Sequence, residues 1–272
     1  MVSKKILIAI IALAMVSSFV PVLATTTHSV QPSFEGNSFL LGSSDSSNWA
    51  GYVALGSVHN VSMSMIIPST DTSGNSYAAF WVGIDGFNDN TVEQTGILAE
   101  PSGFGHNSKT IYYVWYEFYP AAPVYASFTA AAGDYVYANV TYDGSSTFST
   151  FINVTTPSGS VVGTFYGHAT VSGAQDNSAE WIAEAPSSSS GILPLANFGT
   201  ADYGYDYTGI NMTNYATINN TTYSPMGSFN PTEIIMVNQQ SQPEATPSAI
   251  SGGGTSFTIT YDQTSGSHGH RF

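Results

Sequence analysis

From Ser46 onward the chain consists of short segments rich in Val, Ile, Thr, Tyr, Phe and Trp, separated by clusters of Gly, Pro, Asn, Asp and Ser. This alternation is typical of many short β-strands joined by turns. Residues 61–65 and 135–142 alternate in polarity, residues 256–261 predict a closing strand, and Asp143-Gly144 supplies a hairpin turn. Because no segment predicts an amphipathic helix, we expect an all-β fold: an antiparallel β-sandwich of two sheets packed face to face.

The first 24 residues have the three-part layout of a secretory signal peptide. Lys4 and Lys5 precede an apolar stretch from Ile6 to about Val20, and residues 22–24 are small or modest in size, as at a cleavage site. The alternative, an uncleaved membrane anchor, is disfavoured because the apolar stretch is short for a membrane span. We therefore expect a secreted, extracellular protein with no membrane contact after signal cleavage.

The rest of the chain divides by composition. Residues 25–45 are rich in Ser, Thr and Gly and predict a short propeptide or flexible leader. Residues 46–263 form one β-sandwich domain, and residues 264–272 a flexible tail whose two histidines lack further metal ligands nearby in sequence. We therefore expect no metal and no cofactor. Sequons for N-glycosylation, which make the chain a candidate glycoprotein, begin at Asn60, Asn139, Asn153, Asn211, Asn219 and Asn220.

Cysteine and charge content exclude several classes of function. The chain has no cysteine, so neither disulfides nor a thiol nucleophile is available. After removal of Lys4 and Lys5 only Lys109 and Arg271 remain against 18 acidic residues, which excludes binding to nucleic acid or anionic membranes. Such a chain avoids self-repulsion in acid, which favours an acidic working environment. The alternative is an acidic exported protein that works at neutral pH or high salt.

Three segments place acids and amides among large aromatic residues: 80–96, 112–120 and 179–186. In the first, strand alternation separates the core residues Phe80, Val82 and Ile84 from Trp81, Gly83 and Asp85 on the opposite face. In the second, Glu117 shares a face with Tyr113, Trp115 and Tyr119. A carboxyl group against such apolar surface should have a raised pKa and exchange protons at low pH.

The third segment carries Glu180 and Glu184 on one face of a strand. Residues four apart on a strand lie roughly 13 Å from each other. This is too far for the paired carboxylates of a glycosidase, which need about 5–10 Å. If either glutamate is catalytic, its partner must come from another strand, and the alternation does not distinguish the two.

Taken together and in this order, five blocks resemble the glutamic peptidases, or eqolisins, the family of the scytalidoglutamic and aspergilloglutamic peptidases. The resemblance spans about residues 46–262. The blocks are Ser46-Ser47-Asn48-Trp49-Ala50-Gly51-Tyr52, Trp81-Val82-Gly83-Ile84-Asp85-Gly86, Gln94-Thr95-Gly96, Trp115-Tyr116-Glu117-Phe118-Tyr119-Pro120 and Ala179-Glu180-Trp181-Ile182-Ala183-Glu184.

The resemblance implies a jelly-roll, concanavalin-like sandwich and a secreted acid endopeptidase acting on proteins or peptides. It implies that Gln94 and Glu184 activate water without a metal or a covalent intermediate, and that Glu184 rather than Glu180 is the catalytic glutamate. Trp49, Trp81, Asp85 and Glu117 match residues that line or support the substrate groove. We expect a monomer.

Three departures and two alternatives accompany the resemblance. Fungal members contain cysteines, whereas this chain has none, and Glu93 stands where those members carry an apolar residue. Family propeptides tend to be basic and longer, whereas the leader at residues 25–45 contains no Lys or Arg. The first alternative is a non-catalytic carbohydrate-binding or adhesive sandwich that stacks sugars on Trp81, Trp115 and Tyr119. The second is a glycosidase in which Glu117 and Glu184 face each other.

Overall fold

The computed structural model describes residues 45–103 and 109–262. The predicted signal peptide, all but the last residue of the predicted leader, and the predicted tail lie outside the described residues. Asp45, the last residue of that leader, already belongs to the short strand β1 (Asp45–Ser46).

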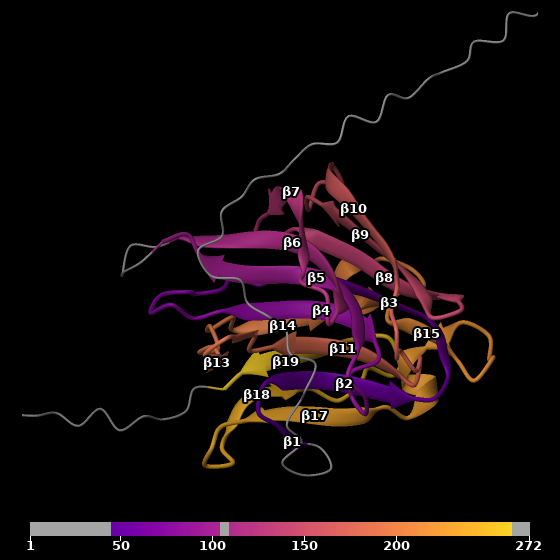
Figure 1. The fold of residues 1–272 in the computed structure, drawn as a ribbon. Coiled ribbons are helices and arrows are strands. Elements are labelled where there is room, and N and C mark those ends of the chain that lie inside the picture. The colour runs from indigo at the N-terminus through magenta and orange to yellow at the C-terminus, as the bar shows by residue number, and fades with distance from the viewer. Residues whose placement is uncertain (1–44, 104–108, 263–272) are drawn as a thin grey trace, which may run out of the picture.

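The first sheet contains seven strands. In order they are β7 (Val124–Ala130), β6 (Thr110–Tyr119), β5 (Val92–Pro101), β4 (Ala78–Ile84), β11 (Ser178–Glu184), β2 (Trp49–Leu55) and β17 (Thr232–Val237). They pair antiparallel throughout, and Figure 1 shows them stacked from β7 at the top to β17 at the bottom.

The second sheet packs against one face of the first. Its main strands, in order, are β10 (Val161–Thr170), β9 (Thr147–Thr155), β8 (Tyr135–Gly144), β3 (Val58–Ile66), β14 (Thr200–Tyr203), β19 (Phe257–Tyr261) and β18 (Pro243–Pro247). The short elements are β12 (Ser187–Ser188), β13 (Gly191–Ile192), β15 (Tyr215–Ile218), β16 (Ser224–Pro225), the helical turn α1 (Tyr205–Thr208) and a 3-10 turn (Met226–Phe229).

Strand β17 joins the two sheets along one edge. Its first half pairs with β2 of the first sheet, and its second half pairs with β18 of the second sheet and, in parallel, with β1. The expected two-sheet β-sandwich is thus confirmed, with a shared strand that closes one side of it.

The core between the sheets is formed by alternate residues, as the strand pattern predicts. Phe80, Val82 and Ile84 of β4 point into it and are buried, together with Met63 and Met65 of β3. Two hydrogen bonds cross this core: the Trp181 indole N–H donates to the Ser62 carbonyl at 2.8 Å, and the Tyr203 hydroxyl donates to the Ile182 carbonyl at 3.0 Å. They fix β11 relative to the second sheet.

The predicted strands at 61–65 and 135–142 are confirmed within β3 and β8, and the one at 256–261 matches β19 except for Ser256. The β8–β9 hairpin lies where Asp143-Gly144 predicts it, but the turn differs. Ser145 and Ser146 occupy the two left-handed positions, whereas Gly144, with φ +93°, lies at a register shift just before them. The turn therefore lies two residues further along the chain than predicted.

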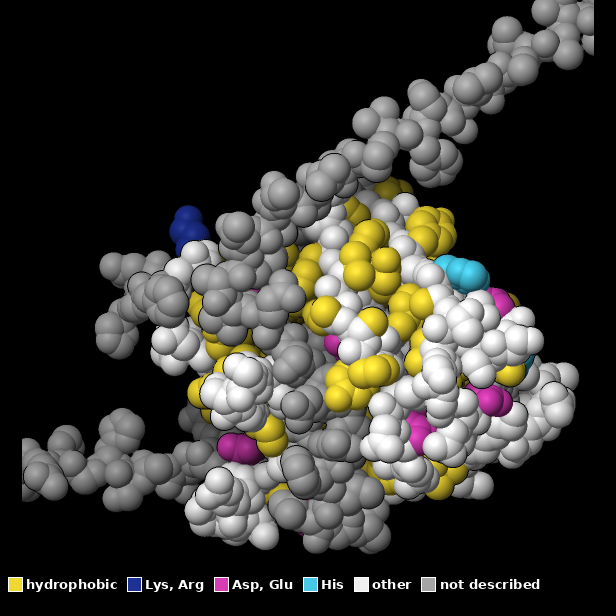
Figure 2. All heavy atoms as spheres, in the orientation of Figure 1, with side chains coloured by type: hydrophobic (Ala, Val, Ile, Leu, Met, Phe, Trp, Pro, Cys, Tyr) yellow, Lys and Arg dark blue, Asp and Glu magenta, His cyan; other side chains and the backbone are white. Residues whose placement is uncertain are grey.

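The surface carries little positive charge. Lys109 is the only Lys or Arg among residues 45–103 and 109–262, and it is the dark-blue side chain in Figure 2. In the same part of the chain, no helix is long and apolar enough to cross a membrane.

Candidate active site

The face of the first sheet that points away from the second sheet carries a separate apolar cluster. Its members include Trp49, Trp81, Trp115 and Ile182, one each from β2, β4, β6 and β11. Because alternate residues of a strand share a face, the same face carries Gln94, Glu117, Glu180 and Glu184. The predicted orientation of all three aromatic segments is confirmed.

The register of the strands arranges the polar residues of this face. Glu117 of β6 lies opposite Gln94 of β5, which lies opposite Gly83 of β4, which in turn lies opposite Glu180 of β11. A side chain at Gly83 would come within 3.3 Å of the Gln94 Cβ and 3.0 Å of the Trp81 ring. The glycine therefore leaves room beside Gln94.

Glu184 lies on the same face at the far end of β11, opposite Trp49 of β2 and Ala79 of β4. The Trp81 indole N–H donates to its Oε2 at 2.7 Å, and the Asn48 amide donates to its Oε1 at 3.4 Å. The rings of Trp49 and Trp81 meet edge to face at 5.0 Å. The Trp81 indole and the Asn48 amide thus hold a carboxyl group that is only 1% exposed.

Burial raises the pKa of Glu184 to about 8, because an ionised carboxylate loses its hydration inside the protein. The hydrogen bond from Trp81, with smaller contributions from Trp49 and Asn48, opposes this shift. The carboxyl group therefore carries a proton throughout the acid range.

Gln94 and Glu117 form the second polar pair of this face. The Gln94 Nε2 donates to the Glu117 Oε2 at 2.7 Å, and both side chains are buried. The Gln94 Oε1 is also buried but accepts no hydrogen bond, which typically costs about 1–3 kcal/mol. Burial raises the pKa of Glu117 well above its usual range, the hydrogen bond from Gln94 opposes this, and the charge of Glu184 adds to it.

Asp85 stabilises a neighbouring loop instead of lining the expected substrate groove. With φ +67° it ends β4, and its carboxylate accepts three backbone N–H groups at 2.7–2.9 Å, from Gln175, Asp176 and Asn177. These bonds fix the loop that leads into β11 and therefore the start of the strand that carries Glu184.

A second group of acids surrounds Asp85. Glu93 and Glu180 are fully buried, and none of their carboxyl oxygens has a hydrogen-bond partner. Burial raises the pKa of Glu93 to about 10, and the charges of Asp85 and Asp89 add to the shift. Burial likewise raises the pKa of Glu180 well above its usual range. Within the described residues no such group has the arrangement of a metal site.

Glu180 and Glu184, which the sequence pattern leaves equivalent, thus differ in their surroundings. Glu184 receives hydrogen bonds from Trp81 and Asn48, whereas Glu180 is enclosed near three other acids. Sequence reasoning missed Asn48 as a partner, because only the pairing of β2 with β11 brings it to Glu184. The Ser46 hydroxyl, 3.3 Å from the Asn48 Oδ1, helps to hold that amide.

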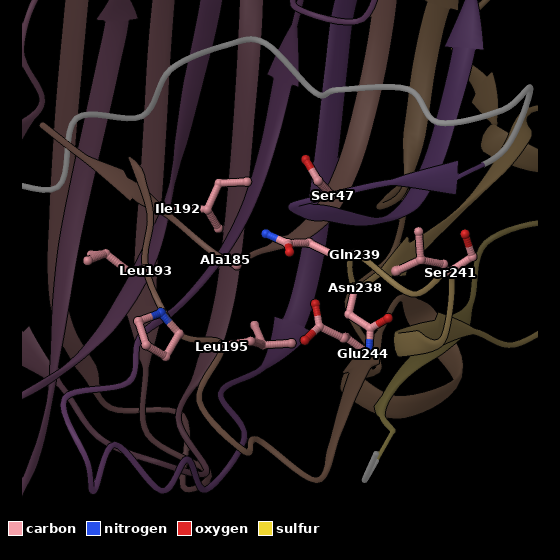
Figure 3. Close-up of a pocket in the computed structure, with 11 residues that line it drawn as sticks. Ser47, Ala185, Ile192, Leu193, Leu195, Asn238, Gln239, Ser241 and Glu244 are labelled. Atoms are coloured by element: carbon pink, nitrogen blue, oxygen red, sulfur yellow. The ribbon is translucent and has the colours of Figure 1, made fainter. Parts of the chain in front are cut away.

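A cavity of about 820 Å³ lies next to the end of β11, and Ala185 and Ser47 are among the residues that line it. Figure 3 shows the apolar side chains of Ile192 and Leu193 on one side of it and Gln239 and Asn238 on the other. The Ala185 side chain belongs to the core between the two sheets, so it points away from the face that carries Glu184.

The sugar-stacking alternative does not fit the two tryptophans on which it depends. Trp81 and Trp115 are both 0% exposed, so neither ring offers a free face to a sugar.

Comparisons with known proteins agree with this architecture. A family model described as the peptidase A4 family matches residues 47–261. Aspergillopepsin-2 from Aspergillus niger is 32% identical over 181 residues, which are 58% of this chain and 62% of that protein. The chain thus spans 62% of the length of this curated relative.

Two solved structures are similar in fold. Scytalido-glutamic peptidase with a transition state analog inhibitor matches with a TM-score of 0.63 and 21% identity, covering 79% of this chain and 98% of that one. Aspergilloglutamic peptidase from Aspergillus niger matches with a TM-score of 0.55 and 22% identity, covering 69% and 99%. At these identities the likeness concerns the fold alone.

Proposed function

The chain belongs to the peptidase A4 family, and from this premise we propose that it is a secreted glutamic endopeptidase that hydrolyses peptide bonds in proteins or peptides, working as a monomer in an acidic medium. Gln94 and Glu184 are the proposed catalytic pair, and no metal or covalent intermediate is needed. The single observation that carries this assignment is the pair of buried hydrogen bonds that hold these two side chains on one face of one sheet.

The raised pKa of Glu184 sets the order of the proton transfers. In acid the carboxyl starts protonated, so its O–H donates a proton to the carbonyl oxygen of the scissile bond as water attacks the carbonyl carbon. The other carboxyl oxygen takes a proton from that water. In the second step Glu184 protonates the leaving amine and recovers a proton from the intermediate as the C–N bond breaks.

Gln94 has the complementary role of a neutral donor. Its amide N–H donates to the carbonyl oxygen and stabilises the partial negative charge that develops there before the proton from Glu184 is fully transferred. An amide does not titrate in the acid range, so this donor is present at every working pH. Trp49, Trp81 and Glu117 position the pair, and Asp85 fixes the entry to β11.

Gln94→Ala is expected to lower kcat for hydrolysis of a denatured protein by about 10²–10³-fold, because a lost oxyanion donor typically costs that much. KM should change little, since the interaction forms in the transition state. The assay covers about pH 2–7 with pepstatin and a chelator present. Gln242→Ala, which removes an exposed amide, is the control and should remain fully active. A fully active Gln94→Ala protein would remove Gln94 from the mechanism, and a wild-type protein inactive at every pH would refute the peptidase assignment.

The pH dependence of kcat/KM tests the proposed order of proton transfers. Only the protonated form of Glu184 is active in this mechanism. Titration of this carboxyl should therefore leave kcat/KM constant well below its pKa and lower it about tenfold per pH unit above about 8. Initial rates on a short peptide, measured on samples shown to be folded, give this profile. A kcat/KM that instead increases tenfold per unit through the acid range would mean that the carboxylate is the active starting form.

A further inference from the structure

The amide of Gln94 is held in an orientation that suits an acceptor better than a donor. Its Nε2 is engaged by the Glu117 carboxyl, whereas the buried and unpartnered group is the carbonyl oxygen Oε1. A half-turn of the amide exchanges its oxygen and nitrogen with almost no movement of the heavy atoms. The NH₂ group would then occupy the position that now holds the unpartnered oxygen, and it would be free to donate to a substrate.

This half-turn is possible only if Glu117 supplies a donor. After it, the Gln94 Oε1 faces the Glu117 Oε2, and an ionised carboxylate offers no hydrogen to share with that oxygen. A protonated carboxyl has one O–H, which satisfies Oε1 at the 2.7 Å separation already present. The proton on Glu117 therefore decides which end of the amide is free.

We propose that Glu117 is a positioning residue that acts as a protonated carboxyl: it donates its O–H to the Gln94 Oε1 and so turns the amide NH₂ toward the substrate oxygen. This inference rests on the proposed function of the site. It assigns to Glu117 a contribution to turnover without contact with the reacting atoms.

The surroundings of Glu117 keep its proton in place. The side chain is 1% exposed, and burial raises its pKa well above the usual range; Glu184 on β11 adds to this shift only when it is itself ionised. From β7, Tyr125 faces it as a phenol whose own pKa is raised by burial, and the charges of Glu100 and Glu117 add to that shift. From β5, Gln94 is the neutral partner. No basic side chain contributes to the shift of Glu117, and Lys109, the only Lys or Arg among the described residues, is exposed before the start of β6.

Two substitutions separate the proposed role from a structural one. Glu117→Gln keeps the shape and, at every pH, both a donor and an acceptor, so it mimics the protonated carboxyl. We expect kcat within about threefold of wild type across the acid range. Glu117→Leu removes the donor, so we expect kcat to fall by about 10²–10³-fold with KM nearly unchanged, as for loss of the oxyanion donor itself. Circular dichroism and urea unfolding of both variants show whether the fold is retained.

A spectroscopic measurement tests the proton directly and does not depend on activity. At pH 6 ordinary carboxyls are ionised, so infrared absorption by protonated carboxyls comes only from shifted groups. The wild-type protein should show one more such group than Glu117→Gln. Equal absorption in the two proteins, or a Glu117→Gln protein as inactive as Glu117→Leu, would overturn the proposal. If the wild-type protein hydrolyses nothing, the peptidase assignment fails by itself, while the infrared comparison still tests the proton on Glu117.

Discussion

Glu184→Gln is expected to lower kcat for peptide hydrolysis by roughly 10³–10⁴-fold while leaving the protein folded. Both proposed proton transfers pass through this carboxyl, and positioned general acid–base catalysis typically contributes about 10²–10⁴-fold. Glutamine keeps the shape and can still accept the hydrogen bond from the Trp81 indole. The loss should therefore appear in kcat, measured with a chromogenic peptide in acid, and only weakly in KM.

Glu180→Gln is the matched control for this experiment. The two glutamates lie on the same strand and the same face and are equally enclosed, but Glu180 lacks the hydrogen bonds from Trp81 and Asn48. We expect the Glu180 variant to keep kcat within about tenfold of wild type. A folded Glu180→Gln protein with no activity, beside an active Glu184→Gln protein, would exchange the roles of the two residues.

Neutralising Glu93 should remove a measurable part of the loss of stability that the buried carboxyls cause between acid and neutral pH. Burial and the charges of Asp85 and Asp89 raise the pKa of this carboxyl from 4.5 to about 10. A carboxyl whose pKa is higher in the folded state than in the unfolded chain binds more protons when folded. Its contribution is therefore full below pH 4.5 and is lost as the pH rises from there toward 10.

The size of the effect follows from the same shift. Each pH unit within this window costs about 1.4 kcal/mol, so between pH 4.5 and 7 the loss from Glu93 is about 3 kcal/mol. Urea unfolding at pH 3 and pH 7 measures the free energy of unfolding for wild type and Glu93→Gln. The difference between the two pH values should shrink by about that amount in the variant.

Glu233→Gln is the control for the change in net charge, because it removes one acid from an exposed position of β17. Any change that it causes in the pH dependence of stability measures the effect of net charge alone. An identical pH dependence in wild type and Glu93→Gln would mean that Glu93 ionises as easily in the folded protein as in the unfolded chain.

The positions of the main strands and the faces of the aromatic segments could be predicted because both depend on local alternation. Phe80 and Trp81 are adjacent, so once one faces the core the other must face away. The β8–β9 turn lies two residues beyond its predicted position, because Ser145 and Ser146 occupy left-handed positions that a sequence pattern assigns more readily to glycine.

The details of the site could not be predicted, because they depend on partners far away along the chain. Nothing local distinguishes Glu180 from Glu184; the difference comes from Trp81 on β4 and Asn48 next to β2. In the same way Asp85 follows a strand that lines the site, yet its carboxylate binds the loop before β11, about ninety residues later in the chain. Only the family resemblance distinguishes the two glutamates, because Glu184 and not Glu180 matches the catalytic position of its block.

The insertion of β11 between β2 and β4 has a consequence for the biosynthesis of the protein. The strand joins partners that precede it by about 130 and 100 residues, and β17 must then close the edge beside β2. Pairings of such long range form late in folding, because the intervening chain must be ordered first. A nascent or partly unfolded chain therefore has Gln94 and Glu184 far apart. If these residues are the catalytic pair, the protein gains the ability to cut polypeptides only when its own backbone is no longer available as a substrate.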